Sequence, residues 1–274
     1  MRQLTKNTGF FLLFLLLFSS CSEYHKVLKG DNIEKKYEMA KDYFNEKEYS
    51  KAVLLLEDIL PFFRASAKNE KIKYMYAYCQ YALGSNIIAA NRFKNLFDTY
   101  PYGKYAEESL YYFAYCTYLE SPPVELDQKS SERAIEAIQL FVNKFPNSDK
   151  VEKSNEYIDK LLLKIEKKAV HKAKLYYKIQ DYKATIWSLQ NLFEEFPMIE
   201  DRSYLNFIMI DSYYELAINS VVTKQHARLE DTRVFYEENT KEFEDSEYAI
   251  EAKNIYKNTL NQLDKLKLKN ERKN

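Results

Sequence analysis

An internal repeat is the feature of this sequence that most restricts its fold. Residues 40–63, AKDYFNEKEYSKAVLLLEDILPFF, align without a gap with residues 173–196, AKLYYKIQDYKATIWSLQNLFEEF. A second pair of segments, AYCQY at 77–81 and AYCTY at 114–118, repeats in the same way. Such self-similarity indicates an array of stacked units that bury their apolar faces against one another. The matched positions of the longer pair are Ala40 with Ala173, Tyr43 with Tyr176, Tyr49 with Tyr182, Leu56 with Leu189, Ile59 with Leu192, and Phe63 with Phe196.

The spacing of the matched residues predicts that each unit is a pair of amphipathic helices joined by a tight turn. Small residues recur where two helix backbones would approach, and bulky residues follow at i+4 and i+7 to fill the space beside them. Pro101, Pro146 and Pro197 each follow an aromatic residue at the end of a unit, and proline cannot continue a helix. The pattern resembles the tetratricopeptide repeat, a helix pair of about 34 residues.

The composition also favours helices, because the chain has only four glycines and six prolines, the residues that most often form turns. We therefore predict an all-α fold, a right-handed α-solenoid of about five tetratricopeptide-like helix pairs with a C-terminal capping helix. The expected pairs span residues 33–64, 69–101, 104–146 (interrupted by a loop at 120–132), 149–197 (with a long first helix) and 201–245, and the capping helix spans 246–267. Residues 33–146 would form the N-terminal repeats, residues 147–245 the C-terminal repeats, and residues 246–274 the capping helix with a basic tail.

The N-terminus contains an apolar run, Phe10 to Phe18, within FFLLFLLLFSSCSEYHK at 10–26. This run is too short to cross a bilayer, which takes roughly 20 residues. Basic residues precede it and two serines and Cys21 follow it, as in a secretory signal. The serines that lead into Cys21 resemble the lipobox of bacterial lipoproteins, which implies cleavage before Cys21 and acylation of its thiol. The alternative is an ordinary signal peptide cut elsewhere.

We thus assign residues 1–20 to a signal peptide and residues 21–32 to a flexible tether. In the sorted lipoproteins that this leader resembles, an aspartate after the cysteine favours retention in the inner membrane. Ser22 occupies that position here. The resemblance therefore points to the periplasmic face of the cell outer membrane.

The rest of the chain lacks the motifs of an enzyme or of a nucleic-acid-binding protein. The formal net charge is zero, whereas phosphate binding needs a basic excess. His25, His171 and His226 lack partners at metal-ligand spacing, and no glycine-rich phosphate loop occurs. We predict a non-catalytic protein without cofactor or metal.

Cys79 and Cys116 occupy the same position in successive first helices. Neighbouring helices lie about 8–10 Å apart, which exceeds the Cα separation of about 7 Å that a disulfide allows. We expect free thiols, and a disulfide is the alternative.

Tyrosines form a second regular pattern. On two successive first helices they recur at i, i+4 and i+7, which places each trio along one helix face. The stripe either lines a groove that receives extended, aromatic-rich segments, or it packs between helices and serves only the core. The candidate groove residues are Tyr37, Phe44, Tyr74, Tyr78, Tyr81, Tyr111, Tyr115 and Tyr118.

Two segments carry a closer resemblance, YPYGKYAEESLYYFAYCTYLE at 100–120 and FPNSDKVEKSNEYIDKLLLKIEKKAVHKAKLYYK at 145–178. With the lipobox and the repeats, the chain resembles the BamD family of outer-membrane assembly lipoproteins. The resemblance implies a scaffold subunit of the β-barrel assembly machinery that binds the POTRA region of a BamA-type barrel protein through its C-terminal repeats and unfolded outer-membrane proteins through its N-terminal repeats. One departure is Ser188, where many members carry arginine.

Two other functions remain open. One is a different periplasmic repeat lipoprotein, such as a coordinator of cell-wall synthesis or division. The other is a ligand-binding lipoprotein of nutrient uptake.

Overall fold

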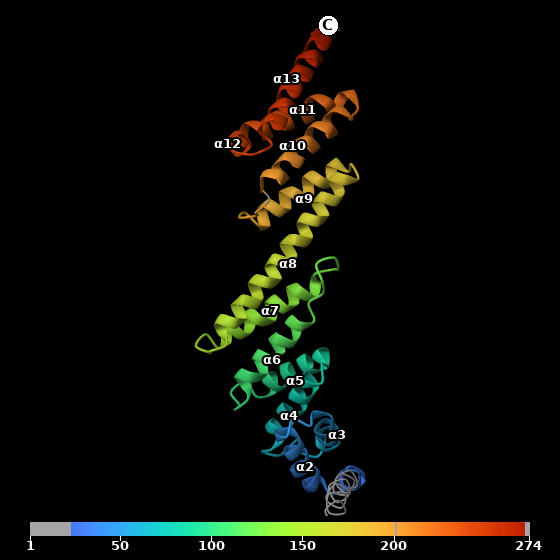
Figure 1. Cartoon of the computed structure of the whole chain (residues 1–274), viewed down its shortest axis with the longest axis vertical. Coiled ribbons are helices and arrows are strands. Elements are labelled where there is room, and N and C mark those ends of the chain that lie inside the picture. Colours follow the sequence, from blue (N-terminus) through green and yellow to red (C-terminus); the bar gives the residue numbers. More distant parts are fainter. Residues whose placement is uncertain (1–22, 201, 272–274) are drawn as a thin grey trace, which may run out of the picture. The chain divides into compact units, whose positions relative to one another are not determined.

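The structure, a computed structural model, describes residues 23–200 and 202–271. Within these ranges it contains helices and connecting turns and no strand (Figure 1). The all-α prediction is thus confirmed. Cys21, with the predicted signal peptide and lipid site, lies outside the described residues.

Five helix pairs follow one another along the chain, as the repeats predict. The pairs are α2 with α3, α4 with α5, α6 with α7, α8 with α9, and α10 with α11, and the capping helix is α13. The bounds are α2 (Ile33–Asn45), α3 (Tyr49–Ile59), α4 (Asn69–Ala82), α5 (Asn86–Thr99), α6 (Ala106–Leu119), α7 (Lys129–Lys144), α8 (Val151–Lys178), α9 (Tyr182–Glu195), α10 (Arg202–Ile218), α11 (Val222–Glu238), α12 (Thr240–Glu244) and α13 (Ala249–Glu271).

The turn between the two helices of a pair is built alike in three of the pairs. Lys47, Gly84 and Gln180 each have a positive φ, of 63°, 77° and 62°. The next backbone N–H donates to a carbonyl five residues back, Glu48 to Tyr43, Ser85 to Gln80 and Asp181 to Tyr176, at 2.8–3.0 Å. This arrangement satisfies carbonyl groups that the helix end leaves free.

The chain divides into two compact units, residues 1–161 and 162–274, and the division falls inside α8. This corrects the predicted division after residue 146. The physical reason is packing. Tyr157 and Leu161 of α8 belong to the same apolar cluster as Ile138 and Phe141 of α7, whereas Ala173 belongs to a cluster with residues of α9 and α10.

The flexible tether predicted for residues 21–32 is wrong for residues 23–29, which are helical. Tyr24 and Val27 are buried in the cluster that contains Ile59 and Met75. The Tyr24 hydroxyl also donates to the carbonyl of Lys51 at 3.3 Å. Helical spacing of the apolar residues 24, 27 and 28 explains why this segment packs on the first repeat.

The second helix of the fifth pair begins earlier than expected. We predicted residues 227–243, and α11 is Val222–Glu238, followed by the short α12. The loop inside the third pair also ends earlier, because α7 begins at Lys129. The buried Gln128 side chain stabilises this loop by donating to the carbonyls of Pro123 at 2.8 Å and Leu126 at 3.1 Å.

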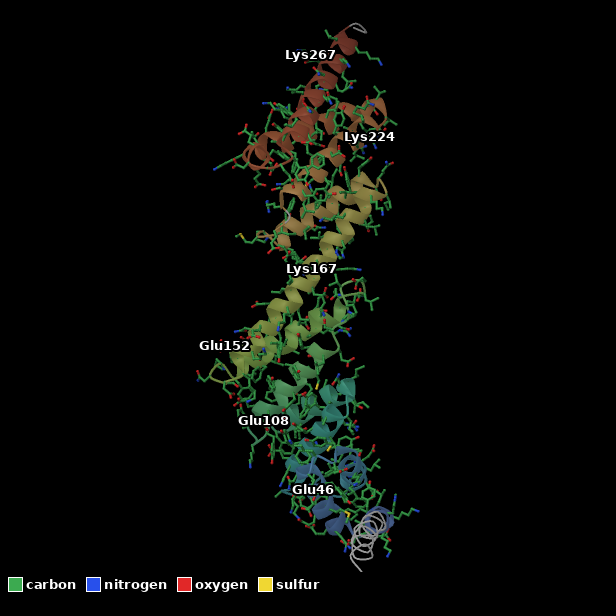
Figure 2. All side chains as sticks on the ribbon, in the orientation of Figure 1. Glu46, Glu108, Glu152, Lys167, Lys224 and Lys267 are labelled. Atoms are coloured by element: carbon green, nitrogen blue, oxygen red, sulfur yellow. The ribbon has the colours of Figure 1, made fainter. Side chains whose placement is uncertain are left out.

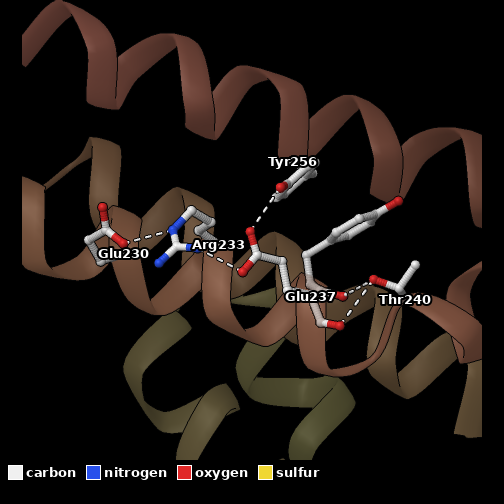
Figure 3. A network of polar contacts seen from close by, with 6 residues as sticks. Glu230, Arg233, Glu237, Thr240 and Tyr256 are labelled. Atoms are coloured by element: carbon white, nitrogen blue, oxygen red, sulfur yellow. Dashed lines mark hydrogen bonds and ion pairs between the residues drawn. The ribbon is translucent and has the colours of Figure 1, made fainter.

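The capping helix α13 is attached to α11 by a polar network (Figure 3). The Glu237 carboxylate accepts hydrogen bonds from the Tyr256 hydroxyl at 2.9 Å and from the Arg233 guanidinium at 2.7 Å. Arg233 also donates to Glu230 at 2.8 Å. The rings of Tyr236 and Tyr256 also stack, with centroids 4.4 Å apart.

Cys79 and Cys116 are free and buried, as expected. Burial raises the pKa of both thiols to about 12. They therefore act as small apolar side chains of the core.

Candidate functional site, a row of aromatic rings

A continuous row of aromatic rings crosses the first helices of the first four pairs, all within residues 1–161. We call it the aromatic row, and it consists of Phe44 on α2, Tyr78 and Tyr81 on α4, Tyr115 and Tyr118 on α6, and Tyr157 on α8. Successive ring centroids lie 5.5, 5.7, 6.0, 6.2 and 4.3 Å apart in that order. These separations are those of interacting aromatic pairs.

Small residues position the row. Ala77 and Ala114 are almost fully buried, and they precede Tyr78 and Tyr115 by one position. Ala77 packs against Phe93 of α5 in one apolar cluster. With alanine on the buried side of the helix, the next residue is directed away from the second helix of the pair.

The rings of the row are only partly covered. Phe44, Tyr78, Tyr81, Tyr115 and Tyr118 are half-buried, whereas Tyr157 is 9% exposed. Each half-buried ring thus packs against its neighbours and still presents some of its surface. The row combines features of the two alternatives, core and groove.

Two of the predicted groove residues are core residues, which corrects the prediction at these positions. Tyr37 is 5% exposed and packs against Phe63, with the Lys68 ammonium 4.6 Å from its ring centroid. Tyr74 is 9% exposed and stacks on Tyr105 at 4.3 Å. Their positions on the helical stripe were expected, but residues from neighbouring segments cover them.

Tyr74 also shows what burial does to its hydroxyl. Burial, and then the nearby Glu108 carboxylate, raise the pKa of Tyr74 well above its usual range. Figure 2 labels Glu108. The ring is therefore a neutral part of the core.

Tyr111, the remaining predicted residue, lies beside the row. Its ring is parallel to that of Tyr115 at 6.0 Å and meets the edge of Phe141 at 5.5 Å. The Lys150 ammonium lies 5.7 Å from the Tyr111 ring centroid. Tyr111 thus connects the row with α7.

Sequence reasoning missed three aromatic residues of this surface. Tyr49 contacts both Phe44 and Tyr78 at 5.8 Å, and Tyr112 contacts Tyr78 at 5.4 Å. The third is Tyr157. Tyr49 was matched with Tyr182 in the internal repeat. No repeated spacing indicates Tyr157, which is the single Phe, Tyr or Trp residue between positions 151 and 175.

Lysines flank the α8 end of the row. The ammonium groups of Lys153 and Lys160 lie 5.7 and 5.9 Å from the Tyr157 ring centroid. Lys153 also pairs with Glu156 at 2.6 Å. Burial raises the pKa of Tyr157 to about 12, so its hydroxyl stays protonated at neutral pH.

The described residues contain no group of three or more His, Cys, Asp or Glu side chains that could hold a metal ion. None of the helices in these ranges is both long enough and apolar enough to cross a membrane. What the aromatic row offers is a partly exposed, mainly apolar surface with hydroxyl groups along it. Such a surface suits the binding of an extended chain with apolar side chains.

The chain matches the model of a known protein family. A model of the family described as YfiO, outer membrane lipoprotein, matches residues 30–229. No curated protein matches the chain.

Solved structures of repeat proteins show only weak similarity to this chain. Nearly identical TPR-like repeats assigned to a kinesin light chain of Podosopora anserina are 11% identical, with 76% of this chain and 96% of that chain covered and a TM-score of 0.35. A tetratricopeptide repeat protein from Parabacteroides merdae is 13% identical, with 84% and 100% covered and a TM-score of 0.36. Scores this low support no statement about function.

Proposed function

Because this chain belongs to the YfiO family of outer membrane lipoproteins, we propose that it is a non-catalytic, lipid-anchored scaffold subunit of the machinery that assembles β-barrel proteins in the outer membrane. In this role it binds the POTRA region of a BamA-type barrel protein. It also receives unfolded outer-membrane proteins and assists their insertion.

The aromatic row is the observation that carries the receiving role. An unfolded barrel protein presents extended segments with alternating apolar and aromatic side chains. The half-buried rings of Tyr78, Tyr81, Tyr115 and Tyr118 offer stacking partners at regular intervals. Stacked rings contribute about 0.5–1.5 kcal/mol each beyond the burial of area, so several weak contacts hold a chain without trapping it.

The partner contact belongs to the C-terminal repeats in this proposal, and Ser188 is no part of it. Ser188 is 7% exposed, and its hydroxyl has no hydrogen-bond partner among the described residues. A side chain so buried is not available for a partner contact at this position.

Membrane attachment depends on Cys21 in this proposal, because the described helices contain no membrane-spanning candidate. Cys21→Ala should give a folded protein that is mislocalised or retains its signal peptide. Normal processing of this variant, together with sedimentation in the outer-membrane fraction, would contradict the lipid anchor.

The direct test of the assembly role is an affinity capture of the tagged chain from detergent-solubilised outer membranes. We expect a POTRA-bearing barrel protein to co-purify. Capture of cell-wall or division proteins alone would favour the first alternative. Capture of a sugar-uptake barrel would favour the nutrient-uptake lipoprotein.

A further inference from the structure

The part of α8 that belongs to residues 162–274 carries a local excess of positive charge. Residues 162–178 include six lysines and His171, and Glu166 is their single acidic residue. The whole chain has a formal net charge of zero. The excess is therefore local, and the C-terminal tail carries another one at residues 265–274. Figure 2 labels Lys167 on α8.

Helical spacing collects these cations on one side of α8. Positions 164, 168 and 172 form one row, and positions 167, 171 and 175 form the next. Ala173 is fully buried and marks the opposite, core-facing side. Glu166 and Glu200 line a hollow together with Lys167 and His171, so acidic groups neighbour the cations on one side of the helix. We call Lys164, Lys167, Lys168, Lys172 and Lys178 the α8 basic face.

Exposed apolar side chains lie among these cations. Leu175, Ile179 and Trp187 are 56%, 60% and 59% exposed. The Lys172 ammonium lies 5.4 Å from the Trp187 ring centroid, which joins the ring of α9 to the basic face of α8. Lysines with leucine and tryptophan on one accessible surface are typical of helices that lie at a membrane interface.

We propose that the α8 basic face, together with these three apolar side chains, binds an anionic lipid surface. The choice of cation favours lipid over a protein partner, because protein–protein interfaces are enriched in arginine and depleted in lysine, and residues 162–178 contain no arginine. Lysine reaches a phosphate with a flexible, apolar stem that can lie along the acyl boundary. This second membrane contact is independent of the barrel-assembly role.

Trp187 makes the proposal directly measurable, because it is the only tryptophan of the chain. The chain purified from outer membranes is reconstituted into vesicles of phosphatidylcholine with or without phosphatidylglycerol, so that any anchor is the same in both. We expect the Trp187 emission to shift to shorter wavelength and to be quenched by bromine-labelled acyl chains only with phosphatidylglycerol. High salt should reverse both effects, because it screens the exposed charges.

Lysine variants test whether lipid binding depends on the α8 basic face or only on the total charge of the chain. Lys167 and Lys178 are both exposed, so Lys167→Gln with Lys178→Gln should leave the fold intact. Each change should lower the ratio of docked to undocked protein about fivefold. The matched control is Lys253→Gln with Lys257→Gln on the exposed side of α13, which should have no effect.

Three results would overturn the proposal. One is quenching that is equal in both kinds of vesicle or absent from both. The second is an equal effect of the control pair. The third is the absence of any lipid effect together with an acidic protein whose capture is lost in the Lys167→Gln variant, which would assign the face to a protein partner.

Discussion

Tyr118 of α6 stacks on Tyr157 of α8, with ring centroids 4.3 Å apart and an interplanar angle of 26°. This contact ends the aromatic row on a helix that the repeat pattern assigned to the C-terminal half. The first unit therefore needs the beginning of α8, both for its core and for its candidate binding surface.

A truncation series tests this dependence. A chain that ends after Pro146 loses Tyr157 and Leu161, which are buried in the first unit, whereas a chain that ends after Glu166 keeps them. We expect the shorter fragment to be less stable by at least about 3 kcal/mol, the usual cost of deleting one large buried side chain. Urea unfolding of both fragments measures the difference, and equal midpoints would show that α8 is dispensable.

The raised pKa of Tyr157 predicts a loss of stability in alkali. Burial raises the pKa of Tyr157 to about 12, so between about pH 10 and about pH 12 the unfolded ring ionises and the folded ring stays protonated. The unfolded state then binds fewer protons, and stability falls as pH rises. Below about pH 10 both states are protonated and the contribution is constant.

The matched variants are Tyr157→Phe and Tyr102→Phe. Other buried tyrosines titrate too, so the wild type and both variants should all be destabilised between about pH 10 and about pH 12, but Tyr157→Phe should lose less. Tyr102 is fully exposed, and its replacement should leave the pH dependence as in the wild type. An identical alkaline loss in all three proteins would mean that Tyr157 is not protected.

The repeated turns predict stabilising glycine substitutions. Lys47 and Gln180 have φ values of 63° and 62°, a conformation that costs residues other than glycine about 1–2 kcal/mol. Glycine loses more backbone entropy on folding, which offsets part of this gain. Lys47→Gly and Gln180→Gly should therefore each stabilise the fold by about 0.5–1 kcal/mol. Gly84→Ala should destabilise by about 1 kcal/mol through the backbone alone, because no atom lies within 4 Å of an added Cβ. Thermal unfolding measures the stability of all three variants. A loss of stability in Lys47→Gly or Gln180→Gly would contradict this explanation of the turns.

The thiols offer a test of core packing. Burial raises the pKa of Cys79 and Cys116 to about 12, so neither forms much thiolate near neutral pH. A thiol reagent should modify them only after the addition of denaturant. Rapid modification of either cysteine in the native protein would show that the helices on this side open locally.

The repeat made most of the fold predictable, whereas the candidate site was predictable only in part. Matching positions in residues 40–63 and 173–196 determined the helix pairs, and the spacing of Tyr78, Tyr81, Tyr115 and Tyr118 identified their shared face. Spacing gives the direction of a side chain from its helix but not what covers it, and so Tyr37 and Tyr74 proved to be buried. Neither Tyr157 nor the division inside α8 has a local signal, because both depend on packing between repeats.

The central claim is that the aromatic row receives extended segments of unfolded barrel proteins, and one binding measurement tests it most directly. A fluorescent peptide with alternating aromatic residues is titrated with the wild type, with Tyr78→Ala combined with Tyr115→Ala, and with Phe207→Ala combined with Tyr248→Ala. The rings of Phe207 and Tyr248 stack at 4.9 Å and are half-buried, but they lie outside the row. Their replacement is therefore a control that removes a similar amount of ring packing.

We predict that the row variant binds the peptide at least about fivefold more weakly, as two rings of about 0.5–1.5 kcal/mol require. The control pair should bind as the wild type does, and both variants should stay folded by circular dichroism. If the row variant binds the peptide as tightly as the wild type while its unfolding temperature falls sharply, the rings serve only the core and the account is contradicted.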